Sequence, residues 1–84
     1  MIELELFGSL RGLAPDDRLR LDVGGPRVAD LRAALVVHAA ARWPGLAPGL
    51  LGKCAFATST EILRDGEALP ADGSMAVLPP VSGG

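Results

Sequence analysis

The stretch SMAVLPPVSGG, residues 74–84, joins an apolar run to a tail rich in proline and glycine. Residues 74–78 are predicted to form a strand, and because residues 75–78 are all apolar we expect it to be buried. Pro79 and Pro80 have a fixed φ and no amide hydrogen, so they end the strand and stiffen the start of the tail. Gly83 and Gly84 leave the terminal carboxylate on a slim tip. Six residues from Pro79 onward reach about 20 Å, far enough to enter the active site of another protein.

Two strands are predicted near the start of the chain. Residues 2–6 alternate apolar and acidic side chains, and residues 18–23 alternate apolar and charged ones. Alternation with a period of two is typical of strands with one buried face. Glycines in residues 8–12 and turn-forming residues in 14–17 separate the two. The simplest pairing of the two strands is a hairpin.

A helix and further strands come next. Val28, Leu31, Leu35 and Ala39 have the spacing of one helix face, and this predicts a helix from Val28 to about Trp43. Residues 44–45, Pro-Gly, end it, and a Gly/Pro-rich loop is expected over residues 46–52. Residues 54–58 predict a third strand. Asp-Gly pairs at 65–66 and 72–73 mark turns, with short strand material at 62–63.

This order predicts an α+β fold in which one mixed sheet packs on one main helix. We expect a domain over residues 1–78 and an extended, flexible Gly-Gly tail over residues 79–84. A single helix covers only one face of the sheet. The last strand is apolar on both faces, with Met75 and Val77 on one and Ala76 and Leu78 on the other. Either a partner covers the second face, or that face is merely lined by small residues.

Composition restricts the function further. The chain has 84 residues, 49% hydrophobic, with one cysteine and a net charge of −2. One cysteine forms no internal disulfide, which fits a reducing cytoplasm. Aromatic residues make up only 4% and basic residues are scattered, so nucleic-acid binding is not supported. No apolar run approaches the roughly 18 residues of a membrane span, and no signal peptide is recognisable.

Few side chains inside the domain suggest chemistry. His38 lies among apolar helix residues without a neighbour at ligand spacing, so we expect no metal site there. Cys54 begins an apolar strand, where a free cysteine is usually a small core residue. We therefore expect no enzyme that acts alone. The carboxylate of Gly84 remains, and it is able to attack the α-phosphate of ATP on an activating enzyme. A sulfur donor would then displace AMP and leave a thiocarboxylate.

Three segments carry a family resemblance: residues 72–84 with their Asp-Gly turn, apolar strand and PPVSGG ending, FGSLR at residues 7–11, and VADLR at residues 28–32. With these segments the chain resembles the MoaD family, the small sulfur-carrying subunits of molybdopterin synthase, which have a ubiquitin-like β-grasp fold (ββαββ). Residues 58–60, Thr-Ser-Thr, depart from the family pattern, and Arg27 stands where the family usually has a Thr or Ser helix cap.

The resemblance implies that Gly84 carries the thiocarboxylate and donates sulfur to cyclic pyranopterin monophosphate. An E1-like adenylating enzyme would use ATP in trans, and a sulfur donor protein would supply the sulfur; the chain itself would bind no cofactor. The large synthase subunit would join it in a heterotetramer. The residues expected to insert into the partners are Pro79, Pro80, Val81, Ser82 and Gly83. The residues expected at the partner interface are Phe7, Met75, Val77 and Leu78.

Other functions remain open from the sequence. Another β-grasp sulfur carrier, for thiazole or tRNA thiolation, shares the Gly-Gly ending and the adenylation step. So does a ubiquitin-like modifier that is conjugated to lysines. The Pro-Pro-Val-Ser lead-in at residues 79–82 favours the molybdopterin carrier over these. An interaction module with an inert tail is the remaining alternative.

Overall fold

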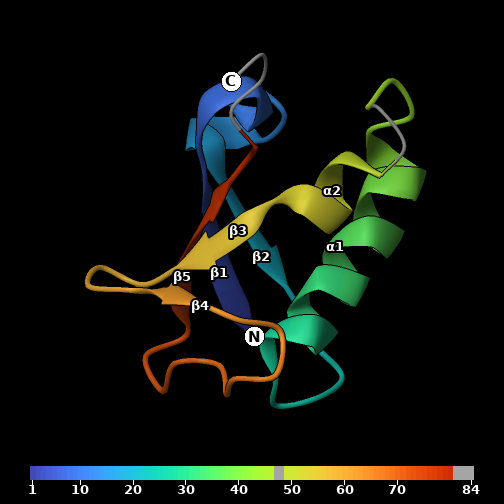
Figure 1. The fold of residues 1–84 in the computed structure, drawn as a ribbon. Helices are drawn as coiled ribbons and strands as arrows, with labels where there is room; N and C mark the ends of the chain where they lie inside the picture. The colour runs from blue at the N-terminus through green and yellow to red at the C-terminus, as the bar shows by residue number, and fades with distance from the viewer. Residues whose placement is uncertain (47–48, 81–84) are drawn as a thin grey trace.

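The structure is a computed structural model that describes residues 1–46 and 49–80. A five-stranded sheet stands beside one long helix (Figure 1). The strands and helices are β1 (Ile2–Leu6), β2 (Arg18–Leu21), α1 (Val28–Arg42), α2 (Leu50–Lys53), β3 (Ala55–Ala57), β4 (Ile62–Leu63) and β5 (Ser74–Leu78). Two short 3-10 turns, η1 (Gly8–Leu10) and η2 (Pro15–Asp17), lie between β1 and β2.

The strand order is β2-β1-β5-β3-β4, so the last strand in sequence lies in the middle of the sheet (Figure 1). β1 pairs with β2 in an antiparallel hairpin and with β5 in parallel. β3 is antiparallel to both β5 and β4. The predicted mixed sheet, its hairpin and its single main helix are therefore confirmed. The two-residue β4 adds a fifth strand at the edge.

The core lies between α1 and one face of the sheet. The alternation in β1 places Leu4 and Leu6 on this face, 0% and 1% exposed. The predicted stripe on α1 faces them and is buried: Val28, Leu31, Leu35 and Ala39. Burying one large aliphatic side chain contributes about 1.5–3 kcal/mol. The apolar face of β1 and the apolar stripe of α1 therefore pack together in one hydrophobic core.

The start of α1 is capped by its own Asp30 and by the loop after β4. The Arg27 side chain makes no cap hydrogen bond, as its residue type predicts. Instead the Asp30 carboxylate accepts a hydrogen bond from the Arg27 backbone amide at 3.0 Å. The backbone amide of Val28 donates to the carbonyl of Glu67 at 2.9 Å. The loop after β4 thus satisfies a helix donor that would otherwise be unpaired.

The sequence did not predict the short helix α2. The loop expected over residues 46–52 contains the start of this helix, which runs from Leu50 to Lys53. Gly49 precedes it with φ 82, a left-handed conformation that favours glycine. Leu51 is 5% exposed and anchors the helix in the core. A four-residue helix is too short to show a hydrophobic period, so this prediction was wrong.

Candidate functional site

β5 carries the chain from the middle of the sheet directly to Pro79 and Pro80 (Figure 1). Its bounds, Ser74–Leu78, are those of the predicted strand. The remaining predicted tail residues, Val81, Ser82, Gly83 and Gly84, lie outside the described residues. Their insertion into a partner and the chemistry of Gly84 therefore stay predictions. The point at which the chain leaves the sheet is nevertheless defined by β5 and its neighbours.

Two of the four residues predicted for the partner interface are in the core instead. Met75 is 4% exposed and Val77 is 0% exposed. Val77 pairs with Leu6 of β1 and with Phe56 of β3, both of which face α1. Side chains at directly paired positions lie on the same face of a sheet, so Met75 and Val77 point toward the helix. Their assignment to the interface is corrected.

Phe7 and Leu78 lie on the side away from α1. Leu78 follows buried Val77 and is half-buried, as the alternation of a strand requires. Phe7 follows buried Leu6 and is 37% exposed. Both residues come directly before the chain leaves its strand. They are the two predicted interface residues that remain available to a partner.

The outer face of the sheet is divided into an apolar half and a charged half. In the apolar half, Leu78 pairs with Ala55, and Ala57 pairs with Ala76 of β5 and with Ile62 of β4. Ile62 is 63% exposed. Alanines thus line the centre, as one of the two sequence interpretations expected. Larger apolar side chains, Ile62 and Phe7, stand at the rim.

The charged half of the outer face lies on β1 and β2. Glu3 contacts Arg18 and Arg20 at 3.7 and 3.5 Å across the hairpin. These ion pairs are exposed, so they contribute little to stability. The part of the outer face over β1 and β2 is therefore exposed to water. The apolar part of the outer face therefore lies over β5, β3 and β4.

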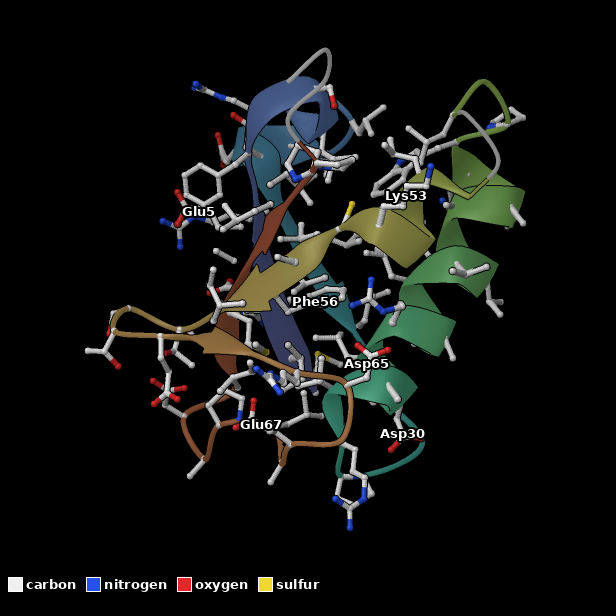
Figure 2. All side chains as sticks on the ribbon, in the orientation of Figure 1. Glu5, Asp30, Lys53, Phe56, Asp65 and Glu67 are labelled. Carbon is white, nitrogen blue, oxygen red and sulfur yellow. The ribbon has the colours of Figure 1, made fainter. Side chains whose placement is uncertain are left out.

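A hollow opens where the tail begins. Its lining includes Phe7, Gly8, Leu50, Lys53, Leu78 and Pro79. Lys53 is on α2, at the end of the domain to which β5 runs (Figure 2). Among the described residues of the lining, Lys53 is the only charged one, and its side chain is exposed. Apolar walls and one positive charge therefore surround the base of the tail.

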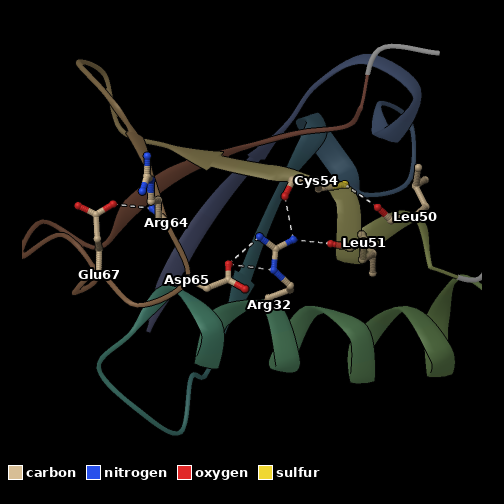
Figure 3. Close-up of polar contacts among 7 residues, drawn as sticks. All are labelled: Arg32, Leu50, Leu51, Cys54, Arg64, Asp65 and Glu67. Carbon is tan, nitrogen blue, oxygen red and sulfur yellow. Dashed lines mark hydrogen bonds and ion pairs between the residues drawn. The ribbon is translucent and has the colours of Figure 1, made fainter. Parts of the chain in front are cut away.

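Cys54 is a structural residue, as its position predicted. It is 3% exposed, and its thiol donates to the carbonyl of Leu50 at 3.3 Å (Figure 3). Burial raises the pKa of the Cys54 thiol, and the positive charge of Arg32 lowers it to a smaller extent. A nucleophilic cysteine needs the opposite shift. Cys54 is therefore held as a neutral thiol.

His38 also has a packing role. It is half-buried, and its ring meets Trp43 edge to face with centroids 5.1 Å apart. Within residues 1–46 and 49–80, no cluster of three histidine, cysteine or acidic side chains is able to hold a metal ion. In the same part of the chain, no helix is long and apolar enough to cross a membrane.

The fold and this exit point define a β-grasp domain of the kind found in sulfur carriers and ubiquitin-like modifiers. The model of the ThiS family matches residues 4–84, and the chain belongs to this family. It is also similar to SAMP1 from Haloferax volcanii, with 31% identity and a TM-score of 0.67. That comparison covers 99% of this chain and 98% of SAMP1. No curated protein matches the chain.

These comparisons confirm the predicted fold and the coarse class of function. Members of this class act together with partner enzymes. SAMP1 is a ubiquitin-like small archaeal modifier, so the similarity fits a modifier as well as a carrier. The choice between these two functions depends on what becomes of the C-terminal carboxylate.

Proposed function

We propose that this chain is the sulfur-carrier subunit of a molybdopterin synthase. Its C-terminal Gly84 is adenylated, becomes a thiocarboxylate and donates sulfur to cyclic pyranopterin monophosphate. The observation that carries the proposal is the path of β5, which runs from the middle of the sheet straight into PPVSGG, residues 79–84. A central strand is held on both sides. It therefore gives the tail a fixed point of departure.

The chemistry at Gly84 proceeds in three displacements. A carboxylate oxygen attacks the α-phosphorus of ATP, and pyrophosphate leaves. A sulfur nucleophile on a donor protein then attacks the acyl carbon of the adenylate, and AMP leaves. The nucleophile is the outer sulfur of a donor persulfide, so the product is an acyl disulfide. A reducing thiol then attacks the donor's inner sulfur, forms a new disulfide with it and leaves a thiocarboxylate at the C-terminus. An E1-like adenylating enzyme binds the ATP, and this chain supplies only the carboxylate.

The chain's own contribution is to present its C-terminal carboxylate to the partner enzymes. Pro79 and Pro80 stiffen the base of the tail, and Gly83 and Gly84 keep its tip narrow. A tail of about 20 Å has to enter a narrow site on each partner in turn. A partner that receives the tip necessarily approaches the surface around its base. Phe7 and Leu78 lie there, so we assign both to the interface with the activating enzyme and with the large synthase subunit.

A ubiquitin-like modifier is the second candidate, and the similarity to SAMP1 favours it. Activation is the same in both cases. In a modifier, however, the amine of a substrate lysine attacks the activated carbonyl and forms an isopeptide bond. The product is a covalent conjugate instead of a sulfurated small molecule. The two functions therefore differ in their acceptor.

Reconstitution separates these functions. The chain is incubated with the activating enzyme, ATP and a sulfur donor, and then with the large synthase subunit and cyclic pyranopterin monophosphate. We expect the dithiolene product, and we expect none with a variant that lacks Gly84. A thiocarboxylate that forms but leaves the pterin unchanged would refute the molybdopterin assignment. Covalent conjugates that require Gly84 would instead establish a modifier.

A further inference from the structure

The contact between Gly8 and Pro79 begins where the pairing of β1 and β5 ends. The parallel register runs to Leu6 and Val77. Continuing it by two residues brings Gly8 beside Pro79. Pro79 has no amide hydrogen, so it cannot donate to a further ladder hydrogen bond. A packing contact between these two residues replaces the ladder.

The contact leaves no room for a side chain at residue 8. Gly8 has φ +58, and a β-carbon placed there would lie 2.8 Å from Cγ and 3.4 Å from Cδ of Pro79. The shorter of these distances is one that real β-carbons essentially never show. The Pro79 ring, which is half-buried, thus lies directly against the backbone of Gly8.

The turn that contains Gly8 is firmly attached to the domain. The amide of Leu10 donates to the carbonyl of Phe7 at 3.1 Å, and the amide of Arg11 donates to the carbonyl of Gly8 at 3.1 Å. Leu10 is 0% exposed and packs in the core. The turn therefore offers a rigid surface to the proline ring.

We propose that Gly8 is a positioning residue for the reaction at Gly84. By seating the Pro79 ring, Gly8 sets the direction in which Pro80 leaves the domain. This inference rests on the proposed function, because it needs an enzyme that receives the tip. A stiff pair of prolines passes a displacement at Pro79 on to the rest of the tail. A reacting group misplaced by about 1 Å is able to cost on the order of a hundredfold in rate.

The test compares Gly8→Ala with a matched control, Gly12→Ala. Gly12 has φ +89, and a β-carbon placed there would have no atom of the described residues within 4 Å. Alanine at residue 12 therefore adds backbone strain without touching Pro79. Pyrophosphate release by the E1-like enzyme is measured at varied concentrations of the carrier, and the melting temperature of each variant is recorded. For Gly8→Ala we expect kcat to fall by on the order of tenfold with little change in KM.

The control is expected to keep both kinetic constants, although backbone strain at φ +89 lowers its melting temperature. An equal loss of kcat in Gly12→Ala would show that strain is responsible and would overturn the proposal. So would an unchanged kcat in Gly8→Ala.

Repeating the comparison in a Pro79→Ala variant tests the contact between Gly8 and Pro79 directly. Pro79→Ala removes the ring atoms that the new β-carbon would meet. In that background we expect Gly8→Ala to cause no further loss of kcat. The same fold-loss of kcat in the wild-type and Pro79→Ala backgrounds would overturn the positioning role.

A wild-type chain that is never adenylated contradicts the proposed function, and the positioning role with it. An adenylated wild-type chain with a fully active Gly8→Ala variant contradicts the positioning role alone.

Discussion

Arg32 of α1 and Asp65 of the loop after β4 form an ion pair in which Nη2 and Oδ1 are 2.8 Å apart. The same guanidinium donates through Nη1 to the backbone carbonyls of Leu51 and Cys54, at 2.6 and 2.7 Å (Figure 3). It also lies over the ring of Phe56, 4.9 Å from the centroid. One side chain thus holds the main helix to α2, to the start of β3 and to the loop that caps the helix.

Removing Arg32 should therefore cost far more than removing its acidic partner. For Arg32→Ala we expect a loss of about 2–3 kcal/mol in the free energy of unfolding, because the two carbonyls lose a charged donor. The Asp65 side chain is 54% exposed, so Asp65→Ala should cost less than about 1 kcal/mol. Urea unfolding at neutral pH measures both. Equal losses would show that the ion pair, and not the carbonyl contacts, is the main interaction.

Substitutions on the two faces of β5 should have different effects, on folding at the inner face and on partner binding at the outer face. Val77→Asp places an unpaired carboxylate in the core, where Val77 is 0% exposed, and we expect it to unfold most of the protein. A domain of this size has a total stability of only about 5–15 kcal/mol. Leu78→Asp should leave the fold intact and weaken binding to the activating enzyme at least about tenfold. Circular dichroism and titration calorimetry test the pair. A folded Leu78→Asp variant with undiminished binding would remove Leu78 from the interface.

The buried thiol of Cys54 should make stability fall in alkaline solution. Its pKa in the folded protein is raised above the ordinary value of 9.0, chiefly by burial. The unfolded chain therefore releases this proton first, so the contribution to stability is complete below pH 9.0 and is lost as pH rises through the folded pKa. The difference in unfolding free energy between wild type and Cys54→Ala, followed from pH 7 to 11, should shrink. A difference that stays constant would contradict the burial of the thiol.

The Asp17 carboxyl should titrate below its ordinary pKa of 3.8. It accepts a hydrogen bond from the Gly12 amide at 2.7 Å, and this bond, with a smaller contribution from Arg11, holds its pKa below 3.8. The contact is therefore complete above pH 3.8 and is lost as pH falls through the lower, folded pKa. The amide chemical shift of Gly12 should report this transition, and Asp17→Asn should abolish it. A midpoint at or above 3.8 would contradict the hydrogen bond.

Local periodicity was sufficient to predict most of the fold. Acidic residues at every second position mark β1, and the spacing of Val28, Leu31 and Leu35 marks α1, so these elements were found within a residue or two. Arg32 was different. It does not share the spacing of Val28, Leu31, Leu35 and Ala39, yet its partners Leu51, Cys54 and Asp65 are distant in the chain. Nothing in the neighbouring residues signals such contacts.

The candidate site was predicted less completely, for a related reason. The alternation of a strand places Met75 and Val77 on one face of β5 and Ala76 and Leu78 on the other. Because both pairs are apolar, hydrophobicity does not show which pair faces the helix. The choice is made by pairing with β1, where Leu4 is opposite Met75 and Leu6 is opposite Val77. The seat of Pro79 on Gly8 likewise depends on long-range register. A glycine in FGSLR, residues 7–11, was visible, but its contact was not.

The central claim is that Gly84 carries sulfur as a thiocarboxylate. The most direct measurement is intact-protein mass spectrometry after incubation with the activating enzyme, ATP and a sulfur donor. We predict a mass gain equal to the replacement of one oxygen by sulfur, absent when Gly84 is deleted and absent without ATP. An unchanged mass, with an activating enzyme that demonstrably forms the adenylate, would contradict the account.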